Sequence, residues 1–138
     1  MKKVIIAEDI KAIIEKDQSF LNRSDVGTIA AASNREVLAL HRTEKADLII
    51  INLDTPEMNG ETLCSLIRNN DELRNVSIII VCSETEADLQ RCAMCGANAF
   101  ITSPINNAVL LQEAYQLLHI APRMSCRMPM RLKTEGKS

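Results

Sequence analysis

Short apolar runs that alternate with helical patterns constrain this 138-residue chain more than any other feature. Strands are predicted at 3–7, 27–31, 48–51, 77–81 and 99–101. Three of these strands are nearly continuous runs of apolar or β-branched residues, which is typical of parallel strands covered on both faces. Parallel strands need crossover connections, so the pattern predicts an open, doubly wound α/β fold with right-handed crossovers.

Helical patterns fill the segments between the predicted strands. Helices are predicted at 10–20, from Ser33 onward, at 59–69, at 84–95 and at 104–120. Ser33 begins a sequence with capping-box spacing that ends at Glu36. The helix at 84–95 begins with acidic residues and stops before Gly96, as the helix dipole and C-cap preferences favour. Pro104 is expected near the first turn of the last helix.

The composition is that of an ordinary globular domain, with 46% hydrophobic and 25% charged residues. No apolar run reaches 18 residues, and the run that follows Lys2 and Lys3 is too short for a signal peptide. We therefore expect a cytoplasmic protein that makes no membrane contact. No predicted strand is followed by a GxGxxG or P-loop sequence, which argues against the nucleotide-binding versions of this topology.

The cysteines favour free thiols over a disulfide framework. There are five, with irregular spacing: Cys64, Cys82, Cys92, Cys95 and Cys126. Cys92 and Cys95 form a CxxC pair, but it lies at the end of a predicted helix, whereas redox pairs gain thiolate character at a helix N-terminus. No second ligand pair is present for a zinc site. We expect free, largely buried thiols.

Polar residues follow two of the apolar strands directly. Glu8 and Asp9 come after the strand at 3–7, and Asn52 follows the strand at 48–51. The carboxyl ends of parallel strands meet at one edge of a sheet, where such folds place their ligands. Oxygen ligands at this edge suit a divalent cation together with a phosphoryl group.

Together these motifs resemble the response-regulator receiver domain over about residues 2–120. The resemblance rests on Glu8-Asp9, on the Asn-x-x-x-Pro-x-Met-x-Gly sequence from Asn52 to Gly60, on Gly96-Ala97 and on Ser103-Pro104. It implies a flavodoxin-like (βα)5 fold with a five-stranded parallel sheet in the order 2-1-3-4-5, and one domain over residues 1–120. It also implies a role in two-component signalling or a phosphorelay.

The phosphorylation machinery that the resemblance implies is incomplete. Asn52 stands where the family has its phosphorylated aspartate. Cys82 stands where a Ser or Thr hydroxyl reads the phosphate, with Ser83 as a neighbouring substitute, and Ser103 replaces a lysine that pairs with phosphate. A carboxamide is a poor nucleophile, a thiol is a weak hydrogen-bond donor, and the lost lysine removes a positive charge. The three departures all weaken phosphoryl transfer.

The metal and switch positions are partly retained. Glu8 and Asp9 match the family's magnesium-binding acidic pair, and Asp54 falls where the family supplies only a backbone carbonyl. We expect weak or vestigial magnesium binding by these three residues and no other cofactor. Phe100 matches the family's aromatic switch, although core packing would equally explain it. A cis peptide bond before Pro104 is also expected.

The expected function is that of a degenerate receiver, or pseudo-receiver, which is a signalling module rather than an enzyme. The resemblance implies that the face formed by residues 84–120 binds a protein partner, a second domain or a second copy of the chain. Two alternatives stay open. One is a working phospho-acceptor that uses Asp54 or a deamidated Asn52, and the other is a small-molecule sensor that uses the pocket freed by the lost phosphate groups.

The C-terminal tail differs in charge from the rest of the chain. Residues 1–120 carry a net charge of −6 and residues 121–138 one of +4. The tail is expected to be a basic linker or the beginning of a following domain. Arg123 and Arg127 resemble the Arg-x-x-x-Arg opening of PilZ domains, which bind cyclic di-GMP, and arginines suit such a ligand because they pair bidentately with phosphate. Nucleic acid is not an expected partner.

Overall fold

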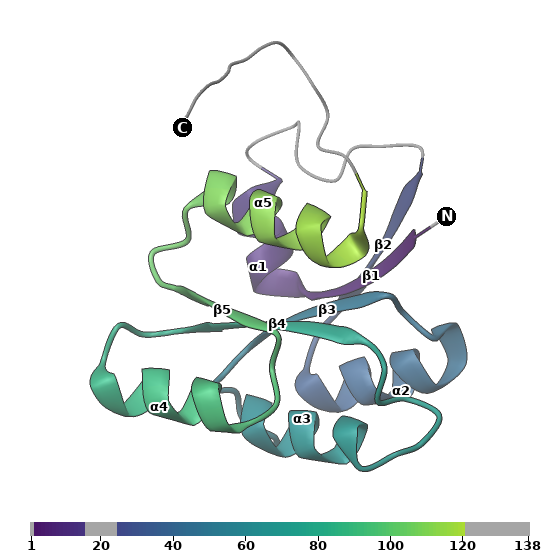
Figure 1. The fold of residues 1–138 in the computed structure, drawn as a ribbon, viewed down its shortest axis with the longest axis horizontal. Coiled ribbons are helices and arrows are strands. Elements are labelled where there is room, and N and C mark those ends of the chain that lie inside the picture. Colours follow the sequence, from purple (N-terminus) through teal and green to yellow (C-terminus); the bar gives the residue numbers. More distant parts are fainter. Residues whose placement is uncertain (1, 16–24, 121–138) are drawn as a thin grey trace, which may run out of the picture.

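Strands and helices alternate strictly along the part of the chain that the computed structural model describes, residues 2–15 and 25–120. The elements are β1 (Lys2–Ala7), α1 (Glu8–Ile14), β2 (Val26–Ala31), α2 (Asn34–Glu44), β3 (Leu48–Asn52), α3 (Gly60–Arg68), β4 (Ser77–Cys82), α4 (Glu86–Met94), β5 (Ala99–Thr102) and α5 (Asn107–Leu118). All strand pairs are parallel, and the sheet order is β2-β1-β3-β4-β5 (Figure 1). The predicted fold class and strand order are confirmed.

Two layers of helices cover the sheet. Helices α1 and α5 pack on one face, and α2, α3 and α4 pack on the other (Figure 1). The central strand β3 serves both cores, because Leu48 and Ile50 belong to the first and Ile49 and Ile51 to the second. Side chains alternate along a strand, so a continuous apolar run can fill both layers.

The first and last helices begin at different residues from those predicted. Helix α1 starts at Glu8, directly after β1, so Glu8 and Asp9 occupy its first turn, where carboxylates interact favourably with the helix dipole. We predicted Pro104 near the first turn of α5, but it lies in the turn before this helix. Asn106 caps this helix instead, because its side chain accepts hydrogen bonds from the backbone N–H groups of Ala108 and Val109.

Two other helices are capped by hydroxyl groups. The predicted cap at Ser33 is confirmed, since its Oγ accepts a bond of 3.1 Å from the backbone N–H of Glu36. Thr85 caps α4 by accepting from the N–H of Asp88, so that helix starts at Glu86, two residues later than predicted. The latter part of the helix predicted at 10–20 lies outside the described residues.

Gly60 allows α3 to begin directly against the end of β3. Its backbone N–H donates to the carbonyl oxygen of Leu53 at 2.6 Å. A Cβ atom at position 60 would lie 3.0 Å from the carbonyl oxygen of Asn52 and 3.1 Å from the Cα of Leu53. The missing side chain therefore sets how closely α3 approaches the carboxyl edge of the sheet.

Candidate functional site

The amide of Asn52 and the carboxylate of Asp9 form the centre of the site. Asn52 ends β3 and Asp9 lies in the first turn of α1, so both side chains reach the carboxyl edge of the sheet. The Nδ2 of Asn52 donates to Asp9 Oδ1 at 2.9 Å and to Asp9 Oδ2 at 3.1 Å. Asp9 Oδ1 also accepts from the N–H of Ile10 at 2.9 Å. Asp9 thus accepts three hydrogen bonds, all from neutral donors.

The carboxylates predicted to bind magnesium do not form a metal cage. Both oxygens of Asp9 face an amide N–H, which repels a cation, and the carboxylate of Asp54 faces a guanidinium group instead. Within residues 2–15 and 25–120, no group of three His, Cys, Asp or Glu side chains is placed to hold a metal ion. This arrangement does not fit the family's magnesium site, and weak binding by Glu8, Asp9 and Asp54 stays a prediction.

Arg91 on α4 draws three carboxylates toward one guanidinium group. Its Nη2 lies 3.0 Å from Asp54 Oδ1 and 2.6 Å from Glu61 Oε1, and its Nη1 lies 3.2 Å from Asp88 Oδ1. The hydrogen bonds to Glu61 and Asp54 raise the pKa of Arg91 above its ordinary value. The cluster joins the loop after β3 to α3 and α4. Sequence reasoning missed Arg91, because two of its three partners, Asp54 and Glu61, lie far away in the chain.

The two predicted phosphate-reading residues, Cys82 and Ser83, lie at the end of β4 and directly after it. Cys82 is the last residue of β4 and is buried, and burial raises the pKa of its thiol, so the sulfur stays neutral. Ser83 Oγ donates to Asp88 Oδ2 at 2.6 Å and lies 3.0 Å from Thr85 Oγ1. The hydrogen bond from Ser83 lowers the pKa of Asp88. The hydroxyl of Ser83 is therefore used at the start of α4.

The remaining predicted positions lie on or after β5. Ser103 follows this strand, and its backbone N–H donates to the carbonyl oxygen of Cys82 at 2.8 Å. The peptide bond between Ser103 and Pro104 is cis, which confirms that prediction. Phe100 is 43% exposed, so core packing does not explain an aromatic residue at this position.

A hollow of about 610 Å³ opens beside Asn52. Its lining includes Glu8, Asp9, Ser33, Asn34, Asp54 and Glu57. Asn34 is only 2% exposed, and its Nδ2 donates to the carbonyl oxygens of Met58 at 3.0 Å and Asn52 at 3.4 Å. This amide holds the loop after β3 against α2. Sequence reasoning missed this role of Asn34.

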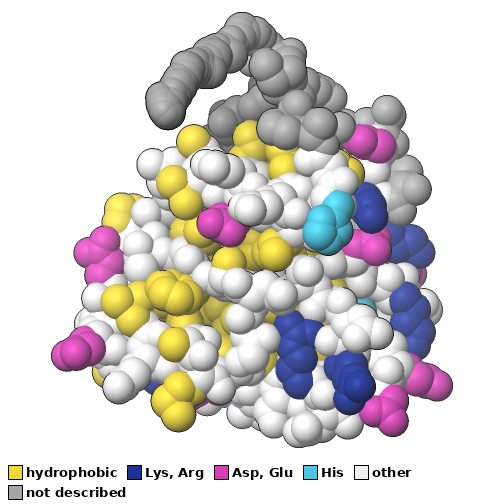
Figure 2. All heavy atoms as spheres, in the orientation of Figure 1, with side chains coloured by type: hydrophobic (Ala, Val, Ile, Leu, Met, Phe, Trp, Pro, Cys, Tyr) yellow, Lys and Arg dark blue, Asp and Glu magenta, His cyan; other side chains and the backbone are white. Residues whose placement is uncertain are grey.

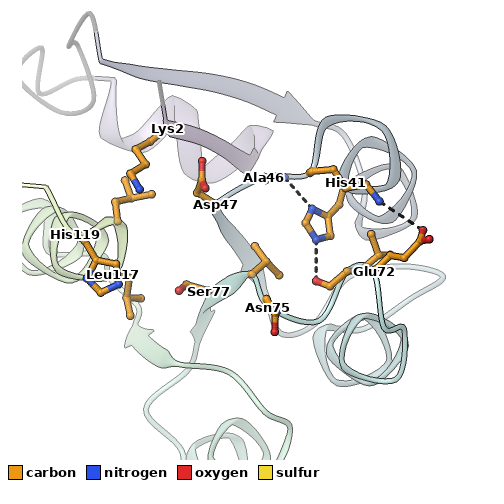
Figure 3. Close-up of a pocket in the computed structure, with 13 residues that line it drawn as sticks. Lys2, His41, Ala46, Asp47, Glu72, Asn75, Ser77, Leu117 and His119 are labelled. Carbon is orange, nitrogen blue, oxygen red and sulfur yellow. Dashed lines mark hydrogen bonds and ion pairs between the residues drawn. The ribbon is translucent and has the colours of Figure 1, made fainter.

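A second hollow, of about 330 Å³, lies near the opposite edge of the sheet (Figure 3). The buried ring of His41 borders it, with Nδ1 accepting from the N–H of Ala46 at 3.0 Å and Nε2 donating to the carbonyl oxygen of Leu73 at 3.1 Å. Figure 3 marks both bonds with dashed lines. Burial lowers the pKa of His41. Both ring nitrogens are used by the backbone, so His41 serves the fold.

Known proteins share this fold and sequence pattern. The response regulator receiver domain family matches residues 4–115. The polar-differentiation response regulator DivK of Brucella anthropi is 29% identical over 106 residues, which is 76% of this chain and 86% of DivK. A receiver domain of a signal transduction histidine kinase from Syntrophus aciditrophicus superposes with a TM-score of 0.75 at 26% identity, covering 94% of this chain and all of that domain.

The chemotaxis response regulator CheY4 of Vibrio cholerae superposes with a TM-score of 0.72 at 23% identity, covering 85% of this chain and 98% of CheY4, and this likeness concerns the fold alone. None of the helices within the described ranges is long and apolar enough to cross a bilayer. The family match covers most of the chain and agrees with the sheet order, the polar edge of the sheet and the cis bond before Pro104. The chain belongs to the response regulator receiver domain family.

Proposed function

We propose that this chain is a pseudo-receiver: a cytoplasmic, non-catalytic module of a two-component pathway that acts through protein contacts and is not switched by aspartyl phosphate. The observation that carries the proposal is the amide of Asn52, which donates to both oxygens of Asp9 at the end of β3. A carboxamide offers no anionic oxygen to attack phosphorus. The buried thiol of Cys82, the occupied hydroxyl of Ser83 and the uncharged side chain of Ser103 all support the same conclusion.

Asp54 is the alternative acceptor that has to be weighed against this proposal. Its Oδ1 lies 3.0 Å and its Oδ2 3.5 Å from the guanidinium of Arg91. To accept a phosphoryl group, Asp54 would have to leave Arg91 and turn toward Asp9. In-line transfer requires placement to within about an ångström, so the ion pair disfavours this route. A deamidated Asn52 would need a cation to offset its repulsion with Asp9.

The test is the intact mass of the protein after incubation with acetyl phosphate and magnesium. We expect no phosphate-sized gain in the wild type. The double variant Asn52→Asp, Ser103→Lys restores the carboxylate and the cation, and its gain would show that the assay works. A gain in the wild type overturns the proposal: loss of that gain in Asp54→Ala would identify Asp54, and loss in Asn52→Ala would identify a deamidated Asn52.

The proposed contact surface consists of α4, β5 and α5. It carries three exposed large apolar side chains, Met94 (83% exposed), Phe100 (43%) and Val109 (45%). Figure 2 shows hydrophobic side chains gathered over the region of α4 and β5. Exposed apolar patches mark interaction sites, so we assign to this surface a partner protein, a second domain or a second copy.

Analytical ultracentrifugation over a range of concentrations tests self-association through this surface. The double variant Met94→Glu, Phe100→Glu should be more monomeric than the wild type at the same concentration. Leu66→Glu is the matched control, because Leu66 is 44% exposed on α3, outside the proposed surface. A wild type that stays monomeric at every concentration refutes self-association, and equal effects of both variants refute the choice of surface.

A small-molecule sensor is the second candidate, and the hollow of about 610 Å³ beside Asn52 favours it. Thermal shift measurements with magnesium, beryllofluoride and cyclic di-GMP test it together with the proposed weak magnesium binding. Stabilisation by beryllofluoride would argue for a working phosphate site.

We also propose that residues 121–138 are a basic linker or the start of a PilZ domain. Arg123 and Arg127 lie outside the described residues, and cyclic di-GMP would act through such a following domain.

A further inference from the structure

Four cysteines lie together between β4 and the helices α3 and α4. Cys64, Cys82 and Cys92 are buried, with exposures of 0%, 6% and 2%. Cys95 follows α4 and is half-buried, with its Sγ donating to the carbonyl oxygen of Cys92 at 3.3 Å. The thiols interact in two pairs, Cys64 with Cys95 and Cys82 with Cys92. Burial and the neighbouring thiol of Cys95 raise the pKa of Cys64 to about 12, and burial and Cys82 raise that of Cys92 to about 12.

Cys95 is the cysteine of this group that a small oxidant can reach. It lines a groove of about 420 Å³ between α3 and α4, together with Ser65, Arg68, Arg91, Met94 and Gly96. The groove is held at one end by Arg68, whose Nε donates to the carbonyl oxygen of Gly96 at 3.0 Å. The high pKa and burial of Cys64 keep its thiol protonated and shielded. Oxidation is therefore expected to start at Cys95, with Cys64 behind it.

Cys64 is a better second thiol for Cys95 than Cys92 is. Cys92 lies three residues before Cys95 in the same chain segment, and its hydrogen-bonding partner is the thiol of Cys82. The partner of Cys64 across the helix interface is Cys95 itself. The bond from Arg68 to Gly96 holds α3 beside the end of α4. Cys64 lies one turn before Arg68 on α3, and Cys95 directly precedes Gly96, so this bond brings the two cysteines to the same junction.

We propose that Cys95 and Cys64 form a reversible disulfide when the protein meets a peroxide. The sulfur of Cys95 attacks one peroxide oxygen, the O–O bond breaks, and a sulfenic acid and water are formed. The sulfur of Cys64 then attacks the sulfur of Cys95, the S–O bond breaks, and the departing hydroxide takes the proton of Cys64 as a second water. Two thiols lose two electrons in all, and the peroxide gains them.

The disulfide would tie α3 to the C-terminal end of α4, next to the exposed Met94 of the proposed contact surface. The bond is independent of the chemistry at Asn52. The disulfide map therefore tests the redox proposal, and the intact mass after acetyl phosphate treatment tests the pseudo-receiver proposal, each without the other.

The test uses the full chain with Cys126→Ser, which removes the thiol outside the described residues. The protein is treated with hydrogen peroxide, its remaining free thiols are alkylated, and the unreduced digest is mapped by mass spectrometry. We expect a peptide pair linked through Cys64 and Cys95 that dithiothreitol separates. Cys64→Ala should abolish the link and leave a dimedone-reactive sulfenic acid on Cys95. Cys92→Ala is the matched control and should retain the link.

Three results would overturn the proposal. One is a map in which Cys95 becomes oxidised only to sulfinic or sulfonic acid. The second is a link from Cys95 to Cys92, and the third is a link between two molecules, seen as a dimer on a non-reducing gel. The map needs no core substitution, so it remains decisive even if Cys64→Ala does not fold.

Discussion

Replacing Asn52 by aspartate turns an attraction at the sheet edge into a repulsion. The variant loses the two amide bonds to Asp9 and places a second carboxylate against the first. At the 2.9 Å that now separates the Asn52 nitrogen and the Asp9 oxygen, two unit charges repel by about 1.4 kcal/mol at the dielectric constant of water. A lost hydrogen bond to a charged group adds about 1.5 kcal/mol or more. We expect Asn52→Asp to lower the free energy of unfolding by about 2–3 kcal/mol in magnesium-free buffer.

Urea unfolding at neutral pH measures this loss, and magnesium should reverse part of it, because a cation between two carboxylates offsets their repulsion. Asn52→Ala is the matched control. It removes the same bonds without adding charge, so it should cost less and should not respond to magnesium. If Asn52→Asp is as stable as the wild type without magnesium, or if both variants gain equally from it, the assignment of the amide as a neutral replacement for a cation is wrong.

Three further predictions concern other parts of the fold. Arg91→Met should lower the melting temperature more at low salt than at high salt, because it frees three carboxylates, whereas Arg74→Met, at a longer and more exposed ion pair, should change little. Gly60→Ala should cost about 1–3 kcal/mol in urea unfolding, since its Cβ meets backbone atoms at 3.0 and 3.1 Å; no loss would show that α3 can move away. The lowered pKa of His41 means that the unfolded chain binds the proton more readily, so stability should fall as the pH drops below about 6.5, and His41→Gln should flatten this dependence.

The fold could be predicted because its main signals are local. Each buried strand is a short apolar run, and Ser33 and Gly96 mark helix ends that the structure reproduces. The start of α1 was missed because Glu8 and Asp9 fit a polar loop as well as the first turn of a helix. Carboxylates in the first turn interact favourably with the helix dipole, and this favours the helix. A sequence pattern based on apolar residues does not include this electrostatic effect.

The site could be predicted only where a motif marks it. Asn52 and Asp9 belong to recognisable sequence patterns, and the structure joins them by hydrogen bonds. Arg91 and Asn34 belong to no such pattern. Arg91 binds Asp54 and Glu61, and Asn34 binds the carbonyl groups of Asn52 and Met58, at distances along the chain that no local rule relates. Arg91 reaches Asp54 from 37 residues away. Such pairings depend on how the helices pack, which is set by the whole fold.

The two clusters at the carboxyl edge share one electrostatic principle, which gives the pseudo-receiver proposal its physical basis. A phosphorylatable site gathers carboxylates that repel one another, and it uses a cation to bring them together and to attract a phosphoryl group. Here two of these carboxylates already have an internal donor, since Asp9 is bound by Asn52 and Asp54 by Arg91. A magnesium ion would have to displace these donors and bear the cost of breaking their bonds. The arrangement therefore favours a site that stays unphosphorylated. Regulation would then act through the proposed contact surface of α4, β5 and α5.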